Sequence, residues 1–121
     1  MKRKLEIVAV YGTLKQGFNN HYMLLTSTYI GNAAIKGYLW TGPGESYPRA
    51  CHDTEAPGVI QVELYQVSPK IMQQMARLET PYGYYMQAVK TEDGVDALMW
   101  ASVDGPDPDC RLIKDGKWGT L

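Results

Sequence analysis

Most hydrophobic positions in this sequence follow the pattern of β-strands rather than that of helices. Apolar residues either alternate with polar ones or form short runs of β-branched residues, and both patterns are typical of strands with one or two buried faces. The sequence predicts five extended segments, at residues 5–11, 29–40, 59–67, 84–91 and 95–103. Asp93-Gly94 separates the last two, and an Asp-Gly pair between alternating segments predicts a hairpin.

One segment has clear helical periodicity. Ser68 is a favoured N-cap, and Pro69 suits the first helical position because its missing N–H would have no partner there. Four apolar residues then fall on one face, namely Ile71, Met72, Met75 and Leu78. Pro81 and Gly83 predict the end of the helix. A second, shorter helix is expected over residues 20–25, with the asparagine as N-cap.

The remaining chain is expected to be loop. Glycine and proline mark loops at residues 41–44 and 103–109, and the chain between Pro48 and Pro57 is expected to be irregular. A chain of 121 residues with 45% hydrophobic residues suits one domain of ordinary size. We therefore expect a single α+β domain over residues 1–121, mostly strands with one dominant helix.

Charge and composition exclude several classes of protein. Twelve Lys and Arg against thirteen Asp and Glu give a net charge of −1, so nucleic-acid binding is not expected. No apolar run approaches the roughly 20 residues of a membrane span. The first strand follows Met1 so closely that we expect no signal peptide and a cytoplasmic location. The two cysteines and two histidines lack metal-ligand spacing, so no metal site is predicted.

A glycine-bracketed loop follows the first predicted strand. Gly12 and Gly17 have the spacing of the first half of a phosphate-binding P-loop, but Phe18 and Asn19 stand where that motif needs lysine and a hydroxyl residue. The sequence therefore excludes a nucleotide site of that type. Two interpretations remain open: a simple turn, or a loop whose N–H groups hold a carboxylate or an oxyanion.

Two glutamates are candidates for acid–base chemistry. Glu79 falls within the apolar stripe of the predicted helix, where burial and the helix C-terminus would both raise its pKa. Alternatively the helix ends at Leu78 and Glu79 faces solvent; periodicity leaves both interpretations open. Glu63 lies on the polar face of a strand and would serve a carboxylate hydrolase with an unrelated substrate. A carboxylate and an N–H loop alone suit a substrate that supplies its own nucleophile.

Residues 10–24 closely resemble the opening signature of the γ-glutamylcyclotransferase-like (AIG2-like) family. They look most like its γ-glutamylamine cyclotransferase branch, in which a Val-Tyr-Gly-Thr-Leu-Lys run leads to Asn-His and a leucine. Further matches are spread over nearly the whole chain: Tyr47-Pro48, Glu63-Leu64-Tyr65, Leu78-Glu79 followed by Pro81 and Tyr85, and residues 113–118.

The resemblance implies a small mixed β-barrel with flanking short helices that needs no cofactor and takes a small γ-glutamyl substrate. Glu79 would be general base and then acid while the substrate's α-amine attacks its own γ-carbonyl, giving 5-oxoproline and an amine or amino acid. The resemblance therefore favours a functional role for Glu79 over the alternative in which it faces solvent at the end of the helix. The implied substrate-binding residues are Tyr11, Gly12, Thr13, Leu14 and Tyr85. A member of the family that binds ligand or protein without turnover is the alternative.

Two positions depart from the family pattern. Val62 stands where the family often has glycine, and its side chain is expected to narrow the cavity or shift the strand. Thr80-Pro81 brings the proline one residue earlier than in the amine-specific branch, so the leaving group stays open. Several aromatic residues either rim a site or fill the core, the core being the commoner place for each: Trp40, Tyr82, Tyr84, Tyr85 and Trp100.

Overall fold

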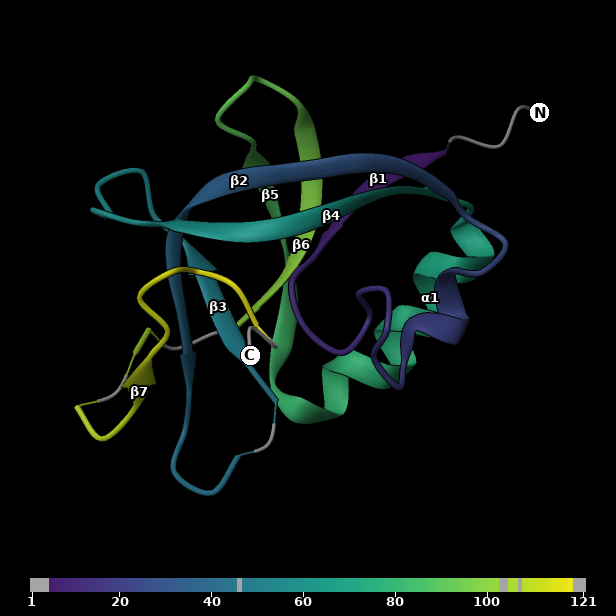
Figure 1. Ribbon diagram of the computed structural model, residues 1–121. Coiled ribbons are helices and arrows are strands. Elements are labelled where there is room, and N and C mark those ends of the chain that lie inside the picture. Colours follow the sequence, from purple (N-terminus) through teal and green to yellow (C-terminus); the bar gives the residue numbers. More distant parts are fainter. Residues whose placement is uncertain (1–4, 46, 103–104, 107, 119–121) are drawn as a thin grey trace.

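The computed structural model describes residues 5–45, 47–102, 105–106 and 108–118 (Figure 1). Its strands are β1 (Glu6–Val10), β2 (Thr28–Thr41), β3 (Arg49–His52), β4 (Val59–Val67), β5 (Tyr84–Lys90), β6 (Asp96–Ser102) and β7 (Arg111–Leu112). One α-helix, α1 (Pro69–Glu79), and two 3₁₀ turns, η1 (His21–Leu24) and η2 (Thr80–Tyr82), complete the elements. The predicted α+β class is thus confirmed.

The strands form one strongly curved sheet in the order β3-β2-β4-β1-β6-β5, with β7 on β2. β1 pairs in parallel with β6, and the other pairings are antiparallel. β2 is long enough to serve two neighbours, because its first part pairs with β4 and its last part with β3. At the change of partner stands Gly37, where a Cβ would collide with the Cys51 carbonyl oxygen.

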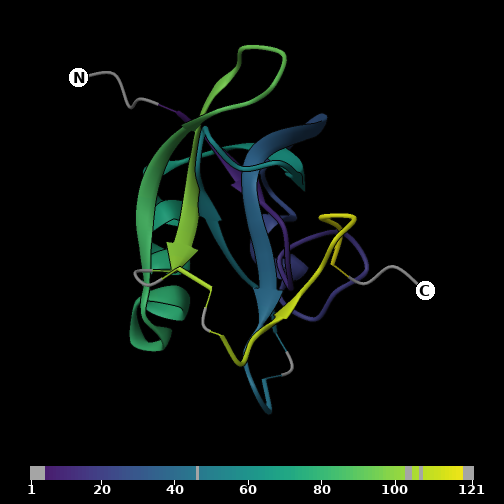
Figure 2. The same cartoon turned by 90° about the vertical axis from the view of Figure 1, so that its left-hand side faces the viewer.

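Side chains bring the two ends of the sheet together and nearly close the barrel. The His52 N–H of β3 donates to Gln87 Oε1 of β5 (3.2 Å), and the Tyr84 hydroxyl donates to the Pro48 carbonyl (2.6 Å). Figure 2 shows β5 and β6 (green) on one side and β2 (blue), with the C-terminal segment (yellow), on the other. The expected mixed barrel with short flanking helices is therefore the observed fold.

The predicted main helix is confirmed in its position and its cap. Ser68 Oγ accepts a hydrogen bond from the Ile71 N–H (3.3 Å), and Pro69 is the first helical residue. Met75 is fully buried, so the apolar face of α1 packs on the barrel, and η1 lies beside the helix (Figure 1). No helix in the described ranges has the length and apolar character to cross a membrane.

The core lies inside the curved sheet and consists of inward-facing strand residues together with residues of α1 and of the loop after β1. Its fully buried members include Val8, Ile35, Ile60, Met75 and Met99. The β4 face that the alternation predicted as apolar is indeed buried, and the Asp93-Gly94 hairpin forms with Gly94 at a φ of 91°. At roughly 25 cal/mol per Å² of buried apolar surface, this core is the main source of folding stability.

Three local predictions need correction. Residues 21–24 form a 3₁₀ turn, and the Asn20 side chain does not cap it. Residues 49–52, expected to be irregular, form β3, because pairing with β2 outweighs the weak local signal of a four-residue strand between prolines. The two-residue strand β7 was not predicted either. The predicted loop at 103–109 lies partly outside the described residues.

The C-terminal segment extends the sheet next to β4, and Gly116 makes this possible. The Gln61 N–H donates to the Gly116 carbonyl (2.7 Å), and Gly116 has a φ of 69°. A Cβ at this position would collide with the Val59 carbonyl oxygen.

We expect Gly116→Ala to destabilise the fold by roughly 3 kcal/mol or more, since backbone atoms must move in addition to the φ strain. Gly44→Ala is the matched control, because Gly44 has a φ of 72° but open space around its Cα. It should cost only about 1 kcal/mol. Urea unfolding of both variants measures the difference, and equal losses would contradict the close packing of this segment on β4.

Candidate active site

A cavity of about 380 Å³ opens where β1 and α1 end, a size typical of small-molecule sites. It is formed by the loop after β1, the last turn of α1, the connection between β2 and β3, and the chain that follows η2. The lining residues are 9–14, 19–20, 47–48, 78–79, Tyr82, Tyr84 and Trp100. Segments distant in sequence therefore converge on one hollow.

The loop after β1 lines this cavity and carries backbone donors without a partner in the described chain. Within the described chain, the N–H groups of Gly12, Thr13 and Leu14 have no protein acceptor. Gly12 packs against Pro48 so closely that a Cβ would lie 2.7 Å from its Cγ. The Thr13 hydroxyl oxygen accepts from Asn20 Nδ2 (2.9 Å), which orients that side chain. Gly12 therefore stands at a place that only glycine can occupy. The loop that contains it offers N–H donors that have no acceptor in the described chain.

Glu63 braces the loop and does not line the cavity. Its Oε1 accepts hydrogen bonds from the Gln16 N–H (2.9 Å) and from the Tyr65 hydroxyl (2.9 Å). These contacts engage one oxygen of the carboxylate, and Glu63 is not part of the cavity wall. The sequence-based alternative of a hydrolase that uses Glu63 therefore has no support in the geometry.

Two further contacts fix the loop from its far side. Lys15 Nζ donates to the Trp118 carbonyl (2.7 Å), which ties the loop to the C-terminal segment. His21 Nδ1 lies 2.9 Å from the Leu14 carbonyl, and because a carbonyl only accepts, the imidazole carries its proton at Nδ1. A loop held in this way keeps its unpaired N–H groups in place without a bound ligand.

Two buried tyrosines, Tyr11 and Tyr84, form part of the cavity wall. The Tyr11 hydroxyl donates to the Trp100 carbonyl (2.6 Å), as the Tyr84 hydroxyl does to the Pro48 carbonyl. Burial raises the pKa of both phenols well above the ordinary value, and the nearby negative charge of Glu79 raises each further. Both phenols therefore stay protonated and act as structural donors.

Glu79 is the ionisable carboxyl of the cavity. It is the last residue of α1, so the alternative in which the helix ends before it is not observed. Its side chain is largely buried, and no described residue pairs with it or donates to it. Burial raises its pKa to about 7. At neutral pH the carboxyl is thus about half ionised, which suits a group that both accepts and donates a proton.

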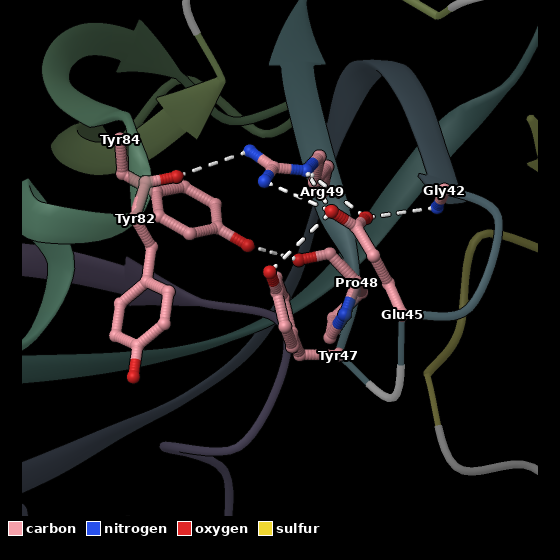
Figure 3. Close-up of polar contacts among 7 residues, drawn as sticks. All are labelled: Gly42, Glu45, Tyr47, Pro48, Arg49, Tyr82 and Tyr84. Carbon is pink, nitrogen blue, oxygen red and sulfur yellow. Dashed lines mark hydrogen bonds and ion pairs between the residues drawn. The ribbon is translucent and has the colours of Figure 1, made fainter.

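An ion pair stands behind one wall of the cavity (Figure 3). Arg49 Nε lies 3.0 Å from both oxygens of Glu45, and Nη2 lies 3.0 Å from Oε2. Glu45 also accepts from the Gly42 N–H (2.9 Å). The hydrogen bonds to Arg49 lower the pKa of Glu45, and those to Glu45 raise that of Arg49. Both side chains are about four-fifths buried, so the pair is a fixed part of the structure.

Arg49 connects this ion pair to three tyrosines of the cavity wall (Figure 3). Its Nη1 donates to the Tyr82 carbonyl (3.3 Å). The guanidinium lies 5.6 Å from the centre of the Tyr47 ring and 5.3 Å from that of Tyr84, within cation–π range. Arg49 does not itself line the cavity, and no signal in the sequence identified it.

The cavity brings together most of the residues that the resemblance indicated. Five of them line it, namely Tyr11, Gly12, Thr13, Leu14 and Glu79. Tyr85 does not line the cavity: it is 41% exposed, because successive residues of β5 point to opposite faces. Its neighbour Tyr84 takes the inward position. Alternation along residues 84–91 shows that one of the two points inward but not which one.

The structure also places the aromatic residues and Val62, whose locations the sequence left open. Tyr84 and Trp100 are buried and line the cavity, Tyr82 lies at its rim, and Trp40 belongs to the core. Val62 is buried and absent from the lining, and β4 keeps its register with β2 around it, so it neither narrows the cavity nor shifts the strand. Among the described residues no group of three His, Cys, Asp or Glu side chains could hold a metal ion.

Burial of Glu79 makes the stability of this protein depend on pH. The folded state holds the proton up to about pH 7, whereas the unfolded chain releases it near 4.5. The burial of Glu79 therefore does not reduce the free energy of unfolding below about pH 4.5. As pH rises from about 4.5 to 7, the free energy of unfolding falls by roughly 3 kcal/mol. We expect Glu79→Gln to remove this loss, so that the variant is more stable than wild type at pH 8 but not at pH 4. Denaturant unfolding at both pH values tests this, and parallel pH dependences would contradict a buried, unpaired carboxyl.

Comparison with known proteins agrees with this geometry. The family described as "Gamma-glutamyl cyclotransferase, AIG2-like" matches residues 8–120. A protein of Pyrococcus horikoshii named "Putative gamma-glutamylcyclotransferase PH0828" is 31% identical over 120 residues, which are 99% of this chain and 97% of the relative. The Arabidopsis thaliana protein named "Putative gamma-glutamylcyclotransferase At3g02910" is 32% identical over 91 residues, 67% of this chain and 48% of that protein.

Solved structures share the fold. The crystal structure of Pyrococcus horikoshii PH0828 has a TM-score of 0.76 at 29% identity, covering 93% of this chain and 89% of that one. An AIG2-like protein from mouse has a TM-score of 0.81 at 17% identity, with 94% and 88% covered, and shows the fold alone. With a family match over nearly its whole length and a relative above 30% identity, the chain belongs to the AIG2-like γ-glutamyl cyclotransferase family.

Proposed function

We propose that this protein is a γ-glutamyl cyclotransferase that converts a γ-glutamyl compound into 5-oxoproline and a free amine. The observation that carries this proposal is that Glu79, with its pKa of about 7, shares a cavity with three residues whose backbone N–H groups have no acceptor among the described residues. A base and an oxyanion-stabilising loop are the two groups that an intramolecular acyl transfer requires.

The reaction balances with Glu79 alone as the proton carrier. The α-amine nitrogen of the substrate attacks its own γ-carbonyl carbon, and the Glu79 carboxylate takes the proton that this nitrogen loses. Negative charge develops on the carbonyl oxygen, and N–H groups of Gly12 to Leu14 stabilise it. The bond to the leaving nitrogen then breaks as Glu79 returns the proton to that nitrogen. The five-membered lactam is 5-oxoproline, and Glu79 is again a carboxylate.

Holding the substrate in a folded conformation is the other task of the cavity. Nucleophile and electrophile belong to one molecule, so the enzyme gains rate by restricting rotation about the glutamyl chain. The buried walls supplied by Tyr11, Tyr84 and Trp100 support this role, because their positions are fixed by hydrogen bonds or by burial.

The lining supports an amine as leaving group, as in the γ-glutamylamine branch of the family. In the described chain, no Lys, Arg or His side chain lines the cavity, and its charged group is the Glu79 carboxylate. A leaving amino acid would bring a second carboxylate into a space with no cation to pair with it. An uncharged alkylamine carries no such cost.

We expect wild type to release 5-oxoproline from γ-glutamylalkylamines faster than from γ-glutamyl-ε-lysine, γ-glutamyl amino acids or glutathione. Glu79→Gln should lower kcat by about 100-fold or more, with an unchanged circular dichroism spectrum. Glu63→Gln is the matched control, because the amide oxygen can still accept from the Gln16 N–H and the Tyr65 hydroxyl, so its effect should be much smaller.

The alternatives give different results in the same assay. Loss of turnover in Glu63→Gln but not in Glu79→Gln would favour a hydrolase that uses Glu63. If folded wild type gave no product from any of these substrates, it would be a binding member of the family without turnover.

The rate should also report the ionisation of Glu79. Because the carboxylate is the base, kcat/KM is expected to rise about tenfold per pH unit below 7 and to change slope near pH 7. A pH–rate profile of the best substrate measures this. The change of slope should be missing from the residual activity of Glu79→Gln, and its persistence there would assign the ionisation to another group.

A further inference from the structure

Two tyrosines stand at the mouth of the cavity. Tyr82 is 55% exposed although it lines the cavity, whereas Tyr11, Tyr84 and Trp100 are buried at its base. Tyr47 is half-buried and packs edge-to-face against Tyr82, with 5.8 Å between ring centres and 64° between ring planes (Figure 3). The opening is thus bordered on this side by two phenol rings.

The burial of the residues that line the cavity indicates which part of the substrate lies beside the two tyrosines at its mouth. The reacting γ-glutamyl part must reach the Glu79 carboxyl and the N–H groups of the loop, which belong to the buried part of the cavity. The leaving group, which must depart to solvent, extends toward the exposed rim. Tyr82 is the most exposed aromatic side chain of the lining, so the leaving group passes along it.

Tyr82 is held in place through its backbone. η2 ends at Tyr82 with Gly83 as its C-cap, and the Tyr82 carbonyl accepts the hydrogen bond from Arg49 Nη1 (3.3 Å). Arg49 is fixed in turn by the three contacts of 3.0 Å to Glu45. The same guanidinium lies against the Tyr47 ring, so one cation positions both tyrosines.

The side chains at the mouth of the cavity favour contact with an apolar carbon chain. Phenol rings offer apolar faces and edges, and the Arg49 charge behind them is already neutralised by Glu45. We propose that Tyr82 and Tyr47 form a subsite for the aliphatic or aromatic chain of the leaving amine, and that Arg49 is the positioning residue that holds it. This inference rests on the proposed cyclotransferase activity and adds the residues that select its substrate.

The test is a homologous series of γ-glutamyl n-alkylamines, from methylamine to hexylamine. We expect kcat/KM of wild type to rise about two- to fourfold for each methylene that reaches the rings. Tyr82→Ala should lose most activity on hexylamine and least on methylamine, through KM. Tyr22→Ala is the matched control, a tyrosine that is 62% exposed and lies outside the cavity, and it should keep the chain-length dependence. A Tyr82→Ala enzyme that slows all substrates equally would overturn the subsite.

Arg49 is tested by the same series. Arg49→Met should flatten the chain-length dependence as Tyr82→Ala does, and the double variant should be no flatter than either single one. Arg49→Lys keeps a charge for Glu45 but not the planar fork, so it should restore part of the dependence. Should Arg49→Met fail to fold, Glu45→Gln loosens the same contact. Unaltered chain-length dependence in folded Arg49→Met and Glu45→Gln would remove Arg49 from the proposal.

The two proposals can fail separately. If wild type forms no 5-oxoproline from any amine of the series, the proposed function fails. Calorimetric binding of the same compounds then decides on the subsite: an affinity that grows with chain length in wild type and not in Tyr82→Ala supports it, and affinities independent of chain length overturn it.

Discussion

The pairing of β1 with β4 on one edge and β6 on the other is the interaction on which the site depends. The register places Val10 opposite Glu63 and Ala9 beside Met99, so the loop that leaves β1 runs between residues of both neighbours. Glu63 of β4 can therefore accept from the loop backbone, and the Trp100 carbonyl of β6 can receive the Tyr11 hydroxyl. A slip by one residue would turn these side chains to the opposite faces and release the loop.

The fold tolerates an unfavourable group at the end of α1. Burying an unpaired carboxyl at neutral pH lowers the free energy of unfolding. The interactions that stabilise α1 have to offset this cost. Ser68 caps the start of α1, and Met75 anchors its middle in the core, so the last turn stays helical through Glu79. Rigid support of a destabilised group is a common way to obtain a base with a pKa near 7.

Much of the fold was predictable because its signals are local. Alternation located β4 and the β5–β6 hairpin, and the Ser68-Pro69 pair located the start of α1. The 3₁₀ turn at η1 and the short strand β3 were mispredicted, since hydrogen bonds with the loop after β1 hold the first and pairing with β2 forms the second. The Asn20 side chain illustrates this, because it donates to Thr13 instead of capping its own helix.

By itself the sequence determined the five longer strands, the main helix, the loop after β1 and, through the family signature, the candidate base Glu79. Each of these depends on residue types and spacings within a few turns of the chain. The tertiary structure alone decided that Tyr84 rather than Tyr85 faces the cavity, and that Arg49 holds the Tyr82 carbonyl. It also decided that Glu79 is largely buried and has no partner among the described residues. Desolvation and long-range hydrogen bonds depend on which groups surround a side chain in space, and the order of residues along the chain does not contain that information.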